Sequence, residues 1–310
     1  MKAKHVIVGD GKLTNKLTIG NDLPFTLMAG PCQLQTRDWA MAICEKMVKI
    51  TEKLKIQYIF KASFDKANRN SVSGARGIGF EEGMRIFDEI RKTFKVPVLT
   101  DVHNTEQPAL VAPHVDMLQQ PAFLIRQTDL SAAIAKAGKA CNLKKAQFQA
   151  PGDMKNIIGK YEEAGNVNVC LTERGASFGY GDLIVDTRSY VIMAQTGYPV
   201  VIDATHAVQK PAAMGSSSGG EAAMAPFIAR AALSTGLVGG VFLETHCEPL
   251  KGGSDIHNMI PLNYMEEVLK QLKAIDDVSK ANQSRYDDWN QEGKPLSYSK
   301  KETTTKRTSK

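Results

Sequence analysis

The chain has 310 residues, of which 43% are hydrophobic, so it is long and apolar enough to bury a full-sized core in a single barrel domain. Its formal net charge is +6, but residues 300–310 contain five basic side chains and one acidic side chain, so the rest of the chain is nearly neutral. A nucleic-acid-binding protein needs a basic stripe on its folded surface. This charge distribution therefore argues against nucleic acid as a partner.

Membrane segments and disulfides are not expected either. No apolar run approaches the roughly 18 residues that a membrane-spanning helix needs, and residues 1–20 lack the apolar core of a signal peptide. The five cysteines are scattered singly without CxxC spacing, which is not typical of a disulfide framework or a zinc ribbon. We expect a cytoplasmic protein with mostly buried thiols.

The predicted elements begin with a small hairpin in residues 1–20. Short apolar segments at 5–8 and 17–19 flank a polar stretch, and we expect this hairpin to cover the floor of the following domain. Eight apolar runs rich in β-branched residues come next. They lie at 25–32, 58–64, 96–103, 117–123, 140–148, 168–175, 199–206 and 239–246.

The segments between these runs have helical periodicity, with 37–54 and 80–94 as clear amphipathic examples and 261–277 as the last helix. Buried parallel strands have nearly continuous apolar runs, and eight βα units favour closure into a barrel. We predict an α/β protein with a (β/α)₈ TIM barrel over residues 21–281. Residues 282–310 lose apolar periodicity and are predicted to be a disordered basic tail.

Ionisable and amide side chains cluster at the ends of the predicted strands rather than at their starts. Active sites of TIM barrels lie at the carboxyl ends of the strands, so these side chains are expected to converge on one site. From the first strand to the eighth, the set comprises Cys32, Lys61, Asp101 with His103, Gln119 with Gln120, Lys144 with Lys145 and Gln147, Glu173 with Arg174, Asp203 with His206, and Glu244 with His246.

Cations dominate part of this set. Together with Lys66 and Arg69 beyond the second strand, Lys61, Lys144 and Arg174 would repel one another unless anions arrive. Phosphate and carboxylate groups are suitable guests for the arginine fork and the lysine point charge. The alternative is local pairing of these cations with Asp65, Asp101 or Glu173.

A possible metal site is formed by Cys32, His206, Glu244 and Asp255. The first three lie at the ends of the first, seventh and eighth strands, which are neighbours in a closed barrel, and Asp255 follows in a loop. Thiolate, imidazole and carboxylate ligands together suit Fe²⁺, Mn²⁺, Zn²⁺ or Co²⁺. The spacing alone is a weak signal, because the residues lie far apart in the sequence and a lone buried cysteine often serves packing.

The motifs closely resemble those of the 3-deoxy-D-manno-octulosonate 8-phosphate synthase family over residues 21–277. They are AGPC (29–32), FKASFDKANR (60–69), LTDVH (99–103), QQPAFLIRQTDL (119–130), NLKKAQF (142–148), TERGASFGY (172–180), DATHAVQ (203–209), SGG (218–220) and FLETH (242–246). The resemblance implies a transferase that condenses phosphoenolpyruvate with D-arabinose 5-phosphate and releases phosphate, on the route to the Kdo sugar of lipopolysaccharide.

The resemblance also implies roles for individual residues. The phosphoenolpyruvate carboxylate and phosphate would be bound by Lys61, Lys66, Lys144 and Arg174 and by the backbone around Ala122. For the pentose, Asn68 would contact a hydroxyl and Arg69 the phosphate. In the family's homotetramer, Phe123 and Arg126 reach the sugar phosphate of an adjacent subunit.

Two further predictions concern contact and catalysis. We expect Gln119 and Gln147 to contact substrate and Asp101 to take part in catalysis. His206 and Asp255 are the candidates for moving the proton, and the residues alone do not decide between them.

Cys32 is the residue that separates two branches of the family. Members with cysteine at this position depend on a metal, whereas members with asparagine there do not. The chain departs from the family pattern at Asn70, in the 72–75 loop, which lacks a common histidine, and at Cys247, where proline is usual. The first two departures put the details of the sugar-phosphate pocket in doubt.

Three alternative functions remain open. A 3-deoxy-D-arabino-heptulosonate 7-phosphate synthase would share the chemistry but take erythrose 4-phosphate, although its relatives usually carry a KPR-type segment in place of residues 66–69. A metal-dependent sugar-phosphate lyase or aldolase would not require phosphoenolpyruvate for phosphate release. A non-catalytic phosphosugar-binding barrel would not need the combination of Lys144, Arg174 and the metal set.

Overall fold

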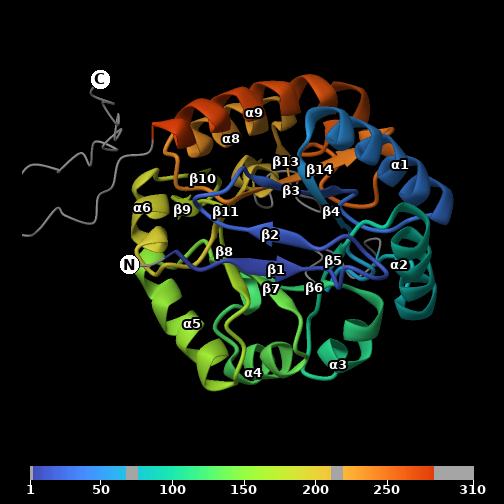
Figure 1. Cartoon of the computed structure of the whole chain (residues 1–310), viewed down its shortest axis with the longest axis horizontal. Helices are drawn as coiled ribbons and strands as arrows, with labels where there is room; N and C mark the ends of the chain where they lie inside the picture. Colours follow the sequence, from blue (N-terminus) through green and yellow to red (C-terminus); the bar gives the residue numbers. More distant parts are fainter. Residues whose placement is uncertain (1–2, 68–75, 211–218, 283–310) are drawn as a thin grey trace, which may run out of the picture.

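A closed barrel of eight parallel strands forms the protein (Figure 1). The computed structural model describes residues 3–67, 76–210 and 219–282. Each strand lies beside the next one along the chain. The last strand pairs in parallel with the strand before it and with the first strand, which closes the barrel. The strands are β3 (Thr26–Gly30), β4 (Gln57–Lys61), β5 (Val98–Asp101), β6 (Met117–Gln120), β7 (Ala140–Lys144), β8 (Val169–Glu173), β11 (Val200–Asp203) and β14 (Gly240–His246). The predicted TIM barrel is confirmed, with strands shorter than most of the predicted runs.

The barrel interior contains one apolar side chain from each strand. These are Met28, Ile59, Leu99, Met117, Ala140, Cys170, Val201 and Phe242. The predicted hairpin, β1 (Val6–Val8) and β2 (Leu17–Ile19), is antiparallel and lies across the middle of the barrel in Figure 1. Val6, Val8 and Ile19 are buried against the interior layer, so the hairpin closes the amino-terminal end and leaves the carboxyl end as the open face.

Helices surround the barrel and cover its outer apolar face (Figure 1). They are α1 (Arg37–Leu54), α2 (Phe80–Phe94), α3 (Gln107–Val111), α4 (Thr128–Lys136), α5 (Met154–Glu163), α6 (Arg188–Ala194), α7 (Ala204–Ala207), α8 (Ala225–Leu233) and α9 (Met265–Ala281). The predictions for 37–54 and 80–94 are confirmed to the residue. The last helix begins four residues later than the predicted 261–277, because a 3₁₀ turn occupies Leu262–Tyr264.

Local interactions explain where α1 begins and ends. The Thr36 hydroxyl accepts a hydrogen bond from the backbone N–H of Trp39, as a helix N-cap does. At the other end Lys55 adopts a left-handed conformation with φ of 55°, and its N–H bonds back to the last turn.

Short elements occupy the connections. They are the strands β9 (Ala176–Phe178), β10 (Asp182–Ile184), β12 (Gln209–Lys210), β13 (Gly219–Gly220) and β15 (Ile260–Pro261), and the 3₁₀ turns η1 (Ala112–His114), η2 (Ala122–Leu124), η3 (Pro151–Asp153), η4 (Ala222–Met224), η5 (Pro249–Lys251) and η6 (Leu262–Tyr264). Among the described residues, no helix is long and apolar enough to cross a bilayer. Four of the five cysteines are buried as expected, and Cys247 is exposed. The predicted tail lies outside the described residues except for Asn282.

Candidate active site

A cavity of about 360 Å³ opens among the carboxyl ends of the barrel strands. Most of the predicted site residues line it. They are Lys61, Lys66, Asp101, Gln119, Ala122, Phe123, Lys144, Gln147, Arg174, His206 and Asp255. Asn68 and Arg69, predicted to hold the sugar, lie outside the described residues. The strand ends therefore converge, as the sequence predicts.

Lys61 at the end of β4 is held by groups at the carboxyl ends of β14 and β3. Its Nζ donates to Oε1 of Glu244 at 2.9 Å and to the backbone oxygen of Cys32 at 3.3 Å. The close approach of β3 and β4 requires Gly30, since a Cβ there would lie 2.1 Å from the backbone oxygen of Lys61. Lys61 and Glu244 are 1% and 0% exposed, so this is a fully desolvated ion pair.

Lys144 at the end of β7 forms the second buried ion pair of the cavity. Its Nζ donates to Oδ2 of Asp203 and lies 3.7 Å from the centre of the Phe242 ring. The same ring lies 5.2 Å from Nζ of Lys61, so Phe242 forms an aromatic floor beneath both ammonium groups. Burial lowers the pKa of Lys144 although Asp203 opposes the shift.

Arg174 follows β8, lines the cavity and has one guanidinium nitrogen that no described group satisfies. It is buried, and its Nη2 donates to Oε1 of Gln209 at 3.0 Å and to the backbone oxygen of His206 at 3.4 Å. Nη1 has no hydrogen-bond partner within the described part of the chain. A buried donor of this kind costs free energy unless a ligand satisfies it, which makes Nη1 a suitable donor to an anion.

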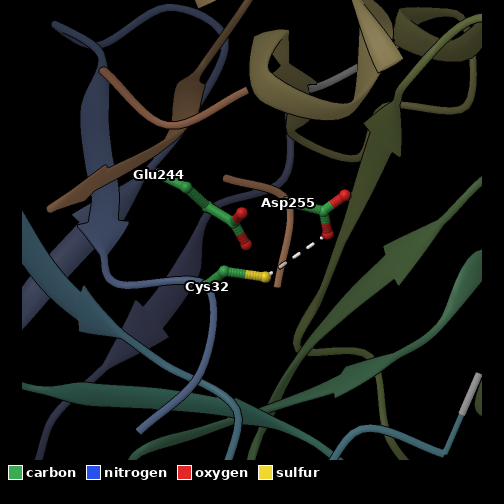
Figure 2. A group of neighbouring side chains, drawn as sticks. All are labelled: Cys32, Glu244 and Asp255. Atoms are coloured by element: carbon green, nitrogen blue, oxygen red, sulfur yellow. Dashed lines mark hydrogen bonds between the residues drawn. The ribbon is translucent and has the colours of Figure 1, made fainter. Parts of the chain in front are cut away.

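Cys32, Glu244 and Asp255 point toward one another (Figure 2), and Asp255 also lines the cavity. One ligand atom from each lies within 4.8 Å of the others. Asp255 Oδ2 accepts a hydrogen bond from the Cys32 thiol at 3.4 Å, and Glu244 Oε2 is buried without a partner among the described residues. A soft sulfur beside two carboxylates is a donor set that suits a divalent transition metal.

His206 borders this cluster from α7. Its Nε2 lies 3.8 Å from Oε1 of Glu244 and 3.7 Å from Oδ2 of Asp255. Asp203 Oδ2 lies 2.8 Å from Nδ1, and Asp203 also caps α7 by accepting from the His206 backbone N–H at 3.0 Å. The Asp203 contact fixes Nδ1 as the protonated nitrogen and leaves Nε2 to face the carboxylates, the usual arrangement for a metal-binding histidine.

The charge states of these groups are strongly perturbed. Burial and the nearby Glu244 carboxylate raise the pKa of the Cys32 thiol, so the metal-free site keeps it protonated. Burial opposes ionisation of Glu244 and Asp255, but Lys61 and His206 outweigh it for Glu244, and His206 and Lys66 outweigh it for Asp255; the pKa of each carboxyl is lowered. A divalent cation would displace the thiol proton, and the four side chains therefore fit a metal ion.

Asp101 lies across the cavity in a second polar cluster. It accepts from the Ser63 hydroxyl, and its Oδ2 lies 2.9 Å from Nε2 of His103. Burial opposes the charged form of Asp101, but the His103 hydrogen bond and the charge of Lys66 hold its pKa well below the usual range. Asp101 is therefore ionised at neutral pH and has no proton to donate.

Four members of the strand-end set belong neither to the cavity nor to its ion pairs and metal cluster. Gln120 hydrogen-bonds to Ser131 of α4, and His246 packs edge-on against Trp39 of α1. Lys145 and Glu173 are buried on the outer side of the sheet, where Nζ lies 3.4 Å from Oε1. They follow the alternation of β7 and β8, in which Lys144 faces inward and its neighbour faces outward. The expectation that every ionisable strand end meets in one site is therefore wrong for this pair and for His246.

The structure also tests local pairing as an alternative for the cations. Asp65 pairs with Arg76 at 2.9 Å rather than with a lysine of the cavity. Asp101 bonds to Ser63 and His103, as described above. The partners of Lys61 and Lys144 are Glu244 and Asp203, a choice that the sequence did not reveal.

Arg126 lies in a separate hollow with Phe148, Gln149, Asp153, Asn156, Ile157 and Lys160. It does not contribute to the cavity of its own chain. Phe123 does line the cavity and is 59% exposed at its rim. Gln209 lines the cavity as well, although it was singled out only as the last letter of a motif.

Comparison with known proteins gives one family and many relatives. Residues 6–281 match the family described as DAHP synthetase I. A 2-dehydro-3-deoxyphosphooctonate aldolase from Granulibacter bethesdensis is 51% identical over 280 residues, which cover 90% of this chain and 97% of that protein. Proteins of the same name from Shewanella frigidimarina and Brucella anthropi are each 51% identical, over 87% and 85% of this chain and 95% of each relative.

Proposed function

Because this chain belongs to the DAHP synthetase I family, we propose that it is a 3-deoxy-D-manno-octulosonate 8-phosphate synthase. It is a transferase that condenses phosphoenolpyruvate, D-arabinose 5-phosphate and water into 3-deoxy-D-manno-octulosonate 8-phosphate and inorganic phosphate, for Kdo and lipopolysaccharide synthesis. The observation that carries the proposal is one cavity in which Lys61, Lys66, Lys144 and Arg174 meet beside Cys32, His206, Glu244 and Asp255.

Phosphoenolpyruvate accounts for the cationic half of the cavity. The molecule carries a carboxylate and a phosphate, and Nη1 of Arg174, which has no partner among the residues described, is proposed to supply one donor for them. Lys66, Lys61 and Lys144 supply positive charge at the walls. The backbone around Ala122 in η2 also lines the cavity and is proposed to assist, as are Gln119 and Gln147.

The reaction joins two carbon atoms and breaks one ester. C3 of the enol attacks the aldehyde carbon of the sugar, water adds at C2, and the phosphate group leaves with its bridging oxygen. Arg174 and the lysines stabilise negative charge as phosphate departs. His206 and Asp255 lie beside the cavity wall and are the candidates for moving the proton of the water or of the new hydroxyl.

A divalent metal, one of Fe²⁺, Mn²⁺, Zn²⁺ or Co²⁺, is part of the proposal. Cys32, His206, Glu244 and Asp255 would hold it. The buried Oε2 of Glu244, which no group in the described ranges contacts by a hydrogen bond, supports that assignment. When bound, it would supply Lewis acidity toward an oxygen of the sugar aldehyde or of water. Binding and orientation of the two substrates are assigned to the side chains of the cavity, whether or not the metal is bound.

The sugar side of the site extends toward the rim. Asn68 and Arg69 are proposed for the pentose hydroxyl and phosphate. Phe123 at the exposed rim, and Arg126 in its separate hollow, are proposed to complete the sugar-phosphate site of an adjacent subunit in a homotetramer.

The proposal is tested by phosphate release from phosphoenolpyruvate with one of two aldoses. We expect turnover with D-arabinose 5-phosphate and little with erythrose 4-phosphate, and no release without an aldose. Turnover with erythrose 4-phosphate alone would assign the chain to the other activity of the family. Phosphate release from a sugar phosphate in the absence of phosphoenolpyruvate would point to a lyase instead.

A further inference from the structure

Gln209 connects the two halves of the cavity through a single amide. Its Oε1 accepts from Nη2 of Arg174 at 3.0 Å, and its Nε2 donates to Oδ1 of Asp255 at 2.7 Å. The two neighbours belong to different parts of the proposed chemistry, since Arg174 faces the anion and Asp255 belongs to the metal cluster. Gln209 has no part in the reaction steps proposed above.

Chemistry fixes the orientation of this amide. Arg174 can only donate hydrogen bonds, and the ionised Asp255 can only accept them. Only a side chain with an acceptor and a donor on the same terminal group satisfies both neighbours, and only one of the two amide orientations does so. A glutamate would lose the donor, and an apolar side chain would lose both interactions.

The backbone holds Gln209 and the Asp255 loop in a fixed relation. In the β12–β13 ladder, Gln209 pairs with Gly220. A Cβ at Gly220 would lie 1.5 Å from Oδ1 of Asn258, so the ladder packs directly against the loop that carries Asp255. Nδ2 of Asn258 lies 3.5 Å from Oδ1 of Asp255, the oxygen that Gln209 contacts.

Asp255 has a backbone conformation that is uncommon for residues other than glycine and that aspartate tolerates better than most. Its φ is 48°, in the left-handed region. Gln209 engages Oδ1, while Oδ2 faces Cys32 and His206. The amide therefore occupies one carboxylate oxygen and holds the rotation of the group that directs the other oxygen at the metal cluster.

We infer that Gln209 is a positioning residue that couples binding of the phosphoenolpyruvate anion at Arg174 to binding of the metal at Asp255. This inference rests on the proposed function, since it concerns the same substrate and metal. An anion on Nη1 orders the Arg174 guanidinium, the ordered Nη2 holds the Gln209 amide, and the amide holds Asp255 in its ligating orientation. By linkage, each ligand then tightens binding of the other by the same factor.

The experiment measures metal binding rather than turnover. Metal-free full-length chain is titrated with Mn²⁺, and free Mn²⁺ is followed by electron paramagnetic resonance, with and without saturating phosphoenolpyruvate and in the absence of any sugar. The wild type is compared with Gln209→Met, which keeps the side-chain length and removes both hydrogen bonds. Gln271→Met is the matched control, because Gln271 is exposed on α9 far from the cavity and bonds only to surface side chains.

For Gln209→Met we expect Mn²⁺ binding about 10-fold weaker, at the lower end of the usual effect of a residue that orients a metal ligand. The ratio of the Mn²⁺ dissociation constants without and with phosphoenolpyruvate should fall by about fivefold, the equivalent of one hydrogen bond. Gln271→Met should match the wild type. If circular dichroism shows that Gln209→Met does not fold, Gln209→Ala replaces it with the same expectations.

Three results would overturn the inference. The first is an unchanged Mn²⁺ dissociation constant in the Gln209 variant. The second is weaker Mn²⁺ binding with an unchanged ratio of the dissociation constants without and with phosphoenolpyruvate, which marks a purely structural role. The third is a wild-type chain that does not bind Mn²⁺. The sugar assay on the wild type tests the proposed function separately. No turnover with D-arabinose 5-phosphate, combined with the expected Mn²⁺ ratios, would overturn the function and support the role of Gln209.

Discussion

The buried pair of Lys144 and Asp203 allows a quantitative test of the claim that the cavity is built for anions. Asp203→Asn keeps the shape of the side chain and removes the counter-charge of an ammonium group that is 4% exposed. Breaking one partner of a buried pair costs about 3–5 kcal/mol. Lys144 can avoid carrying an unpaired buried charge by losing its proton. From the ordinary lysine pKa of 10.5, deprotonation at pH 8 costs about 3.4 kcal/mol, since each pKa unit is worth about 1.36 kcal/mol. This cost is the upper limit of the destabilisation that the unpaired lysine can cause.

We therefore expect Asp203→Asn to destabilise the protein by about 3 kcal/mol. At about 2 °C per kcal/mol for a chain of this size, the thermal midpoint should fall by about 6 °C, measured by differential scanning fluorimetry. Phosphoenolpyruvate restores a negative charge beside Lys144, so its addition should raise the midpoint of the variant by about 2 °C more than that of the wild type.

The control is Asp186→Asn, which removes the charge of an exposed pair with Arg188. Surface pairs contribute about 0–1 kcal/mol, so this midpoint should change by no more than about 2 °C. The reasoning fails if Asp203→Asn has the midpoint of the wild type. It also fails if phosphoenolpyruvate stabilises the variant and the wild type equally.

Three further predictions follow from single residues. Cys32→Ser should lower the bound metal at least about 10-fold by elemental analysis without changing the far-ultraviolet circular dichroism, whereas the exposed Cys247→Ser should keep it; a metal content equal to that of the wild type would exclude ligation by Cys32. Gly30→Ala should lower the thermal midpoint by at least about 4 °C, because its Cβ would meet the β4 backbone at 2.1 Å, and an unchanged midpoint would disprove the close approach of β3 and β4. Burial lowers the pKa of His246 below its ordinary 6.5, so at this residue the unfolded state binds more protons than the folded state, and its own contribution to the free energy of unfolding should fall as the pH drops from 7.5 to 5. In urea titrations, the difference in unfolding free energy between the wild type and His246→Gln should therefore change over this range in favour of the variant at low pH. A difference that does not change with pH would exclude His246 as a contributor.

The barrel could be predicted from the sequence because its signal is local. Each buried strand is a short apolar run followed by a helical period, and the α1 boundaries follow from a Thr36 cap and a left-handed Lys55. The clustering of site residues at strand ends follows from the topology alone. What the sequence did not provide was the partner of each charge, because Lys61 and Glu244 are 183 residues apart and meet only when the barrel closes.

The alternation of side chains along β7 predicts which of Lys144 and Lys145 faces the barrel interior. Cys141 and Leu143 on β7 belong to the outer core, so the alternation of the strand places Lys144 inside and Lys145 outside. Gln209 is different, because no periodicity marks it. Its two hydrogen bonds depend on a positive φ at Asp255 and on a glycine in β13, and neither can be assigned before the loops are placed.

The carboxylates of the cavity show why the anion and the metal belong together. Glu244 gives Oε1 to Lys61 and keeps a buried Oε2 without a partner in the described ranges, while Arg174 keeps a free Nη1. These two atoms cannot satisfy each other, because Glu244 belongs to the metal cluster and Arg174 is turned toward Gln209. A cation alone would satisfy only the carboxylate, and an anion alone only the guanidinium, each leaving a buried group that costs about 1–3 kcal/mol. The site is therefore expected to reach its lowest free energy only when both are bound, and the Gln209 amide lies directly between them.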